Sequence, residues 1–176
     1  MARAGKVDLR VFQQELAARL ASKTTAQVES SRLGLASAGR QWLVRLADAG
    51  EVIATPHIVP VPLTKPWFVG VANIRGNLYG VVDFAGFLGG DAATPHAASA
   101  GSRLMLFGPR VGELRAGILV PQVLGLRNLS ALTPAGRPAD ARAWFGERWI
   151  DNSGGEWQEI DLTCLAQDPE FLQVGI

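Results

Sequence analysis

The side chains that could act as catalysts or metal ligands are few and far apart in this chain. The two histidines, His57 and His96, have no histidine, cysteine or carboxylate at the spacing of a metal site, so we interpret both as structural or surface residues. The single cysteine, Cys164, has no nearby residue that could serve as its base, and we predict a buried, inert thiol. These residues predict no catalytic group, no metal site and no cofactor.

Motifs of the common enzyme classes are also missing from the sequence. No serine stands in a GxSxG nucleophile elbow, and the glycines at 70, 76 and 80 do not form a GxGxxG phosphate cradle. The acidic residues between positions 48 and 91 are scattered, so their spacing alone does not predict a pair of catalytic carboxylates. The tryptophans are spread along the chain, which favours packing in a core and a hairpin over a platform for nucleic-acid bases: Trp42, Trp67, Trp144, Trp149 and Trp157.

One cation, Arg75, interrupts a glycine-rich and otherwise apolar stretch over residues 65–90. A buried guanidinium without a partner is costly, so Arg75 must reach water, pair with an acid such as Asp83 or Glu51, or contact a binding partner. Two interpretations stay open from the residues alone. Arg75 could form a structural ion pair that braces the turn at Gly76, or it could be a contact point on a binding groove.

The composition excludes several classes of partner and location. The chain has 176 residues, 48% of them apolar, with 17 basic and 16 acidic side chains and a net charge of +1. No basic cluster or basic face is present, which argues against nucleic acid as a partner. The longest apolar run, residues 116–126, is far shorter than the roughly 20 residues of a membrane helix, so no membrane insertion is expected. The N-terminus has no apolar signal core, and we predict a cytoplasmic protein.

The N-terminal region predicts a helix over residues 8–20. Leu9, Phe12, Leu16 and Leu20 fall at spacings of three, four and four residues, which is one face of a helix. A polar stretch separates this segment from the first predicted strand. The helix could pack on its own domain, which we favour slightly, or it could be a detachable arm that lays Phe12 and Leu16 on a partner.

The rest of the chain predicts short strands separated by turns. Residues 33–35 and 42–46 alternate between the two faces of a strand. Further strands are predicted at 51–53, 78–82, 103–107, 115–120, 124–129, 148–150 and 156–160, and surface loops at 91–102 and 133–142. Short helices are predicted after Asp83 and at 162–166, with a final turn from Pro169. This pattern indicates an all-β sandwich or barrel.

The segment GVANIRGNLYGVVDFAGFLG resembles the signature of CheW-like domains. That signature is a glycine, a few apolar residues, Asn-x-Arg-Gly, an apolar strand, and an aspartate before a short helix. The matching residues are Gly70, Asn73, Ile74, Arg75, Gly76, Val81, Val82 and Asp83. The general resemblance covers about residues 31–165. Within the family, the segment KPWFVGVANIRG, the N-terminal extension and the C-terminal tail are most similar to the adaptors of pilus-associated chemosensory systems.

The resemblance implies a fold and a function. The fold is all-β, with two intertwined, five-stranded SH3-like barrels, short helices, an N-terminal extension at residues 1–30 and the CheW-like domain at 31–176. The function is that of a noncatalytic coupling protein between the cytoplasmic tip of a methyl-accepting receptor and the regulatory domain of a CheA-type histidine kinase, within membrane-associated arrays and with twitching motility as output. The resemblance implies partner-binding positions at Val69, Gly70, Asn73, Ile74, Arg75, Gly76 and Val81.

One departure from the family pattern and two rival interpretations remain. Family members commonly carry an aspartate where this chain has Pro121, in the run GILVPQV, so the charge and one backbone donor are absent there. A flagellar-type adaptor of the same family is the first rival, and neighbouring genes for pili or flagella would separate the two. The second rival is a small β-barrel enzyme that uses Asp83 and His57 around Arg75.

Overall fold

The computed structural model describes residues 29–89, 101–139 and 141–176. The predicted helix over residues 8–20 and most of the predicted loop at 91–102 lie outside these ranges. Eleven strands are described: β1 Ser31–Ser37, β2 Arg40–Arg45, β3 Ala49–Ala54, β4 Phe68–Ile74, β5 Asn77–Asp83, β6 Arg103–Phe107, β7 Ala116–Val120, β8 Gln122–Asn128, β9 Leu132–Pro134, β10 Phe145–Asp151 and β11 Glu156–Ile160. Each strand predicted from the sequence is confirmed, with shifts of a few residues at the ends.

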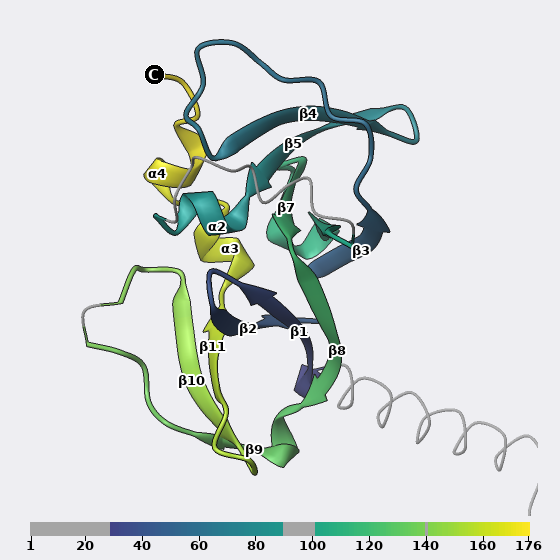
Figure 1. The fold of residues 1–176 in the computed structure, drawn as a ribbon. Helices are drawn as coiled ribbons and strands as arrows, with labels where there is room; N and C mark the ends of the chain where they lie inside the picture. Colours follow the sequence, from purple (N-terminus) through teal and green to yellow (C-terminus); the bar gives the residue numbers. More distant parts are fainter. Residues whose placement is uncertain (1–28, 90–100, 140) are drawn as a thin grey trace, which may run out of the picture.

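The strands form two mixed sheets that lie one above the other (Figure 1). The upper sheet has five strands in the order β3-β6-β7-β5-β4, and the lower has six in the order β8-β1-β2-β11-β10-β9. Parallel pairing of β2 with β11 places the first two strands and the last strand of the described chain in one sheet. The sixth strand is β9, which pairs with β10 inside the region predicted to be a loop at 133–142. The predicted all-β architecture with two sheet subdomains is confirmed, although one sheet has six strands instead of the predicted five, and that loop prediction is wrong at its first residues.

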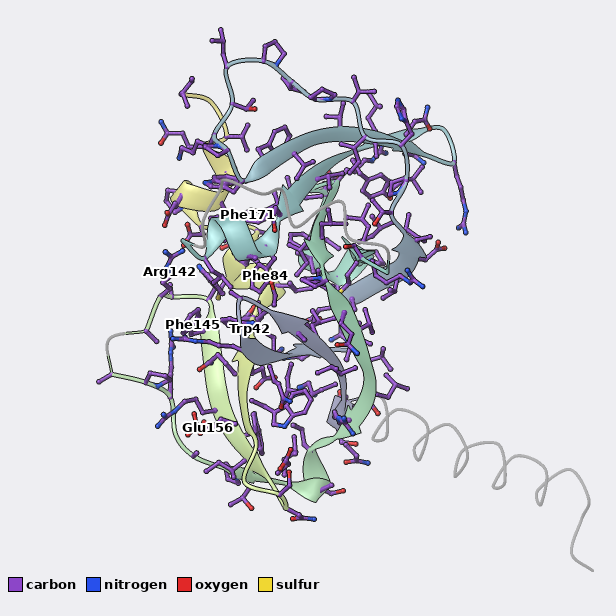
Figure 2. The ribbon with its side chains drawn as sticks, viewed as in Figure 1. Trp42, Phe84, Arg142, Phe145, Glu156 and Phe171 are labelled. Carbon is purple, nitrogen blue, oxygen red and sulfur yellow. The ribbon has the colours of Figure 1, made fainter. Side chains whose placement is uncertain are left out.

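A large apolar core fills the space between the two sheets. Trp42 of β2 is completely buried and meets the ring of Phe84 edge-on at 5.2 Å. Phe145 of β10 contacts Trp42 from another side at 5.6 Å (Figure 2). A smaller cluster lies inside the five-stranded sheet, around Val81 and Leu104. The tryptophans therefore lie mainly in packing positions, as predicted, and only Trp149 is half-buried.

Three short α-helices are described: α2 Phe84–Phe87, α3 Leu162–Leu165 and α4 Pro169–Leu172. Each begins after an aspartate whose carboxylate accepts hydrogen bonds from backbone N–H groups of the first turn, and these N-caps are Asp83, Asp161 and Asp168. Single-turn 3₁₀ helices occur at η2 Pro109–Val111 and η3 Leu129–Ala131. No helix in the described ranges has the length and hydropathy needed to cross a lipid bilayer.

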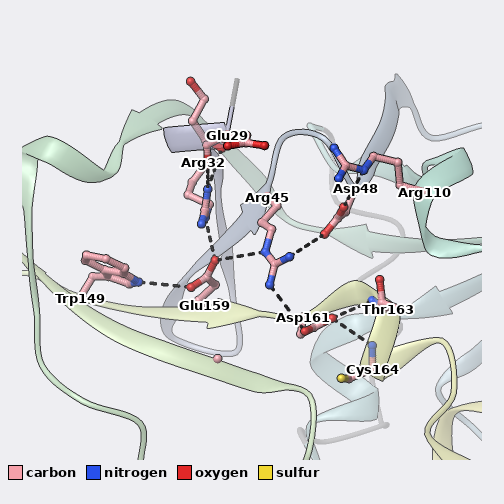
Figure 3. A network of polar contacts seen from close by, with 12 residues as sticks. Glu29, Arg32, Arg45, Asp48, Arg110, Trp149, Glu159, Asp161, Thr163 and Cys164 are labelled. Carbon is pink, nitrogen blue, oxygen red and sulfur yellow. Dashed lines mark hydrogen bonds and ion pairs between the residues drawn. The ribbon is translucent and has the colours of Figure 1, made fainter. Parts of the chain in front are cut away.

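A chain of ion pairs connects the six-stranded sheet to the segment that leads into the five-stranded sheet (Figure 3). Its charged members are Arg32, Arg45, Arg110, Asp48, Glu159 and Asp161. Arg32 Nε lies 2.7 Å from Glu159 Oε1, and both side chains are buried. Arg45 lies between Glu159 at 3.9 Å and Asp48 at 4.0 Å. Removing one partner of a buried pair such as Arg32–Glu159 would leave the other charge buried and uncompensated, which is strongly destabilising.

The β10–β11 hairpin contains a carboxylate, Asp151, that should make the free energy of unfolding depend on pH in the acidic range. Asp151 accepts hydrogen bonds from the Ser153 side chain and backbone, from the Trp157 indole at 3.0 Å and from the Gly155 N–H at 2.9 Å. These donors, Ser153 foremost, hold the pKa of Asp151 well below its ordinary value. A depressed folded-state pKa stabilises the protein above the unfolded pKa of about 3.9, and that stabilisation is lost as the pH falls below it.

We therefore expect the unfolding free energy of Asp151→Asn to decline less steeply than that of the native protein between about pH 5 and pH 2. Urea unfolding at several pH values, followed by circular dichroism, measures both slopes. Glu113→Gln is the matched control, because Glu113 is exposed and has no hydrogen bond or ion pair within the described ranges. Equal slopes for native protein and Asp151→Asn would contradict the prediction.

Candidate partner-binding surface

The turn between β4 and β5 explains the order of residues in the Asn-x-Arg-Gly motif. Arg75 and Gly76 occupy the two turn positions with φ of 52° and 83°, the left-handed values that a tight hairpin turn requires. Gly76 adopts such a value without strain, and its N–H donates to Asn73 Oδ1 at 2.9 Å. Asn73 and Gly76 therefore shape the tip of the hairpin, and Arg75 projects from its end.

Arg75 is exposed and forms an ion pair with Glu51 of β3. The side chain of Arg75 is 75% exposed and that of Glu51 is 49% exposed. The acid beside Arg75 is thus Glu51 and not Asp83, and the guanidinium also reaches water. An exposed pair contributes only about 0–1 kcal/mol to folding. Because so little stability depends on the pair, both charged groups can exchange their contact for one with another molecule.

Two shallow pockets lie beside this ion pair. One has a volume of about 260 Å³ and is lined by Glu51, Ile74 and Arg75 among others. The next has a volume of about 540 Å³ and includes residues 112–115, and Tyr79 lines both pockets. The hairpin tip is therefore the charged end of a concave and partly aromatic surface. The sequence did not single out Tyr79 or residues 112–114, because only the sheet pairing of β5 with β7 brings them close to Arg75.

A family model described as the CheW-like domain matches residues 33–145, which is more than half of the chain. The chain belongs to the CheW-like domain family. The match includes most of β1, all of β2 to β9 and therefore the whole hairpin that carries Arg75. The family resemblance read from the Asn-x-Arg-Gly segment is confirmed.

Individual proteins resemble this CheW-like chain over most of its length. Protein PilI of Pseudomonas aeruginosa is 28% identical over 172 residues, which cover 97% of this chain and 94% of PilI. Protein FrzA of Myxococcus xanthus is 28% identical over 121 residues, which cover 66% of this chain and 71% of FrzA. The crystal structure of scaffolding protein TtCheW from Thermoanaerobacter tengcongensis aligns with a TM-score of 0.59 at 16% identity, over 75% of this chain and 88% of that one, and supports the fold.

The other motif positions of this CheW-like domain differ in what they can offer a partner. Val81 is completely buried in the core of the five-stranded sheet, and Gly70 is buried against the backbone of Val59. Val69 and Ile74 are half-buried. Of the seven predicted positions, three are exposed at the hairpin tip, namely Asn73, Arg75 and Gly76. The buried residues Gly70 and Val81 hold the hairpin in position and do not reach its surface. Their contribution to binding is therefore indirect.

The structure does not bring together the residues of the enzyme hypothesis. Asp83 lies at the opposite end of β5 from Arg75, roughly 20 Å away at about 3.3 Å per residue. Asp83 is buried and caps α2, and His57 is exposed on the connection that precedes β4. The prediction of a buried Cys164 is wrong, because this residue is exposed. Desolvation and the neighbouring Asp161 carboxylate raise the pKa of the Cys164 thiol, so little of it is thiolate.

Pro121 occupies the corner where the chain leaves one sheet for the other. It follows β7 of the five-stranded sheet and precedes β8 of the six-stranded sheet, and it belongs to neither ladder. A proline is acceptable at this corner because the ladder pairings on either side do not use its missing N–H. Pro121 therefore interrupts neither of the two strands that it joins.

Proposed function

We propose that this protein is a noncatalytic adaptor that couples a methyl-accepting receptor to a CheA-type histidine kinase in a pilus-based motility system. The observation that carries the proposal is the exposed Arg75–Glu51 pair at the tip of the motif hairpin, in a chain related to PilI over 97% of its length. CheW-like proteins serve as scaffolds without chemistry of their own. The relatives PilI and FrzA support a coupling role in motility.

The surface at Arg75 suits a contact that forms and breaks. A charged pair at the rim of an interface steers encounter and specificity more than it adds affinity. Ile74 and Tyr79 supply apolar area beside it, and the adjoining pockets are shallow enough for a folded domain to cover. We assign the kinase regulatory domain to this surface. The second partner, the receptor tip, consists of helices with apolar stripes. Such helices bind by laying their apolar side chains in a groove of the other protein.

The rest of the chain fits the same assignment. We propose that residues 1–30 form an extension and that residues 31–176 form the CheW-like domain that carries both contacts. The adaptor would work in the cytoplasm and be recruited to receptor arrays at the membrane. Signal transfer then consists of a change in receptor packing that is relayed to the kinase through the two sheets.

Calorimetric titration of the protein with the regulatory domain of the CheA-type kinase from the same organism tests this proposal. Transient interfaces of this class are modest in area, so binding in the micromolar range is expected. We expect Arg75→Ala to weaken binding about tenfold or more, as at an interface hot spot, while the free energy of unfolding changes by less than about 1 kcal/mol.

Arg103→Ala is the matched control, because Arg103 is also exposed but lies on β6, and within the described ranges it donates hydrogen bonds only to backbone carbonyl groups. It should bind the kinase domain like the native protein. Loss of folding in Arg75→Ala would identify a structural ion pair instead of a contact point. Binding that is absent in the native protein, or unchanged in Arg75→Ala, would overturn the assignment of this surface.

A further inference from the structure

A second and larger groove lies on the six-stranded sheet, away from Arg75. Its volume is about 740 Å³, which is within the usual range of ligand sites. It lies between the β1–β2 turn, the β10–β11 hairpin and the segment that joins β9 to β10. That segment is the loop at the lower left of Figure 1. The residues that matter here are Arg40, Gln41, Pro138, Phe145, Arg148 and Glu156. The Arg75 hairpin belongs to the other sheet, so the two surfaces are separate.

The groove contains two arginines whose charge is not neutralised within the described ranges. Neither Arg40 nor Arg148 forms an ion pair there, and both are exposed. Arg148 is held in place by donating to the carbonyl oxygens of Ala135 at 3.3 Å and Gly136 at 3.4 Å. A guanidinium fixed in this way loses little conformational freedom when it binds a carboxylate, and it offers two parallel donors.

The groove also offers acceptors and an apolar floor. Gln41 Oε1 is shielded from solvent and has no hydrogen-bond partner within the described ranges. Such an oxygen is stabilised when a ligand supplies an N–H. Glu156 adds a carboxylate that forms no ion pair within the described ranges. Phe145 is half-buried and rests edge-on against Trp42, and Pro138 faces the groove from the opposite segment. Figure 2 labels Phe145 and Glu156 on this side of the molecule.

From these contacts we infer that the groove binds an extended, acidic segment of a partner protein. Carboxylates of the segment pair with Arg40 and Arg148, its backbone N–H groups donate to Gln41 Oε1 and Glu156, and its small side chains rest on Phe145 and Pro138. A polyanion such as nucleic acid has few N–H donors for the two acceptors, whereas a peptide backbone supplies one at almost every residue. The inference does not depend on which partner occupies the Arg75 surface, and a protein that joins two partners needs two separate surfaces.

Nuclear magnetic resonance of the ¹⁵N-labelled full-length protein tests the inference. The probe is a capped hexapeptide of alternating glutamate and alanine, and its counterpart has lysine in place of glutamate. We expect the glutamate peptide to shift amide signals of residues 39–41 and 155–158 in a saturable way, less so at high salt, and the lysine peptide to leave them unchanged. The double variant Arg40→Glu/Arg148→Glu should raise the Kd about tenfold or more.

Arg103→Glu is the matched control, because it reverses an exposed arginine that is likewise held by backbone carbonyls on the other sheet. It should bind the glutamate peptide like the native protein. Retained signal dispersion in the double variant establishes that it is folded. The inference is overturned if the groove signals do not move, if the double variant binds as tightly as the native protein, or if inorganic phosphate or a short oligonucleotide at equal charge produces the same shifts. Kinase binding at Arg75 can succeed or fail independently of each result.

Discussion

Replacing Trp42 by alanine is expected to lower the free energy of unfolding by about 3–5 kcal/mol, among the largest effects of any single substitution in this chain. Trp42 is completely buried in the core shared by the two sheets. Its ring contacts Phe84, which follows β5 of the five-stranded sheet, and Phe145 of the six-stranded sheet. The indole N–H donates to the Ser37 carbonyl at 3.0 Å. The substitution therefore leaves a cavity and removes a buried hydrogen bond at the same time.

Urea unfolding followed by circular dichroism measures this loss, since tryptophan fluorescence would change with the substitution itself. Trp149→Ala is the matched control, because Trp149 is half-buried and makes one long indole hydrogen bond, of 3.4 Å, to Glu159. We expect Trp149→Ala to cost less than half as much as Trp42→Ala. If both substitutions had equal effects, the shared core would not be the main source of stability.

Local patterns in the sequence predicted most of the secondary structure because they depend on near neighbours. The alternation around Trp42 specifies a strand with two different faces. Asp83, Asp161 and Asp168 each precede a short helix, and each accepts the backbone donors that such a residue is expected to satisfy. The β10–β11 hairpin follows from turn-forming residues between two strand-like runs. None of these features requires knowledge of distant parts of the chain.

Features that depend on distant residues were not predictable from one sequence. The buried pair of Arg32 with Glu159 joins residues 127 positions apart, and no local pattern links them. Strand β9 is three residues long and exists because β10 offers an open edge beside it. The sequence alone also could not decide whether Asp83 or Glu51 forms the ion pair with Arg75. The pairing of β3 with β6 and of β6 with β7 decided the choice, because it determines where Glu51 lies.

The candidate site also has a part that the sequence predicted and a part that only the structure reveals. Motif resemblance located the hairpin correctly in the sequence but treated its residues as one group. The structure separates Arg75 at the exposed tip from Val81 in the core, which are six positions apart in the chain. A family motif can contain both residues that contact a partner and residues that only support them. The burial of each side chain distinguishes the two kinds. Gly70 is the clearest supporting residue, and its role can be measured.

Replacing Gly70 by alanine should destabilise the fold by roughly 2–6 kcal/mol, the sum of backbone strain and a steric clash of about 1–3 kcal/mol each. Gly70 has a φ of +140°, and an added Cβ would lie 2.2 Å from the Val59 carbonyl oxygen. Val59 and Val71 exchange two backbone hydrogen bonds of 2.8 and 2.9 Å across this point. The methyl group would therefore push the connection before β4 away from the strand, and the bridge between Val59 and Val71 would break.

Substitutions at two other glycines separate the cost of backbone strain from the cost of the steric clash. All three variants are compared by urea unfolding followed by circular dichroism. Gly76→Ala introduces backbone strain, with φ of +83°, but no atom of the described residues lies within 4 Å of the added Cβ. It should cost about 1–2 kcal/mol. Gly175→Ala has neither feature and should be neutral. If Gly70→Ala were no worse than Gly76→Ala, the close approach of Val59 would not matter. If Gly70→Ala were stable but unable to bind the kinase domain, Gly70 would be a direct contact, and the division between supporting and contacting residues would fail at this position.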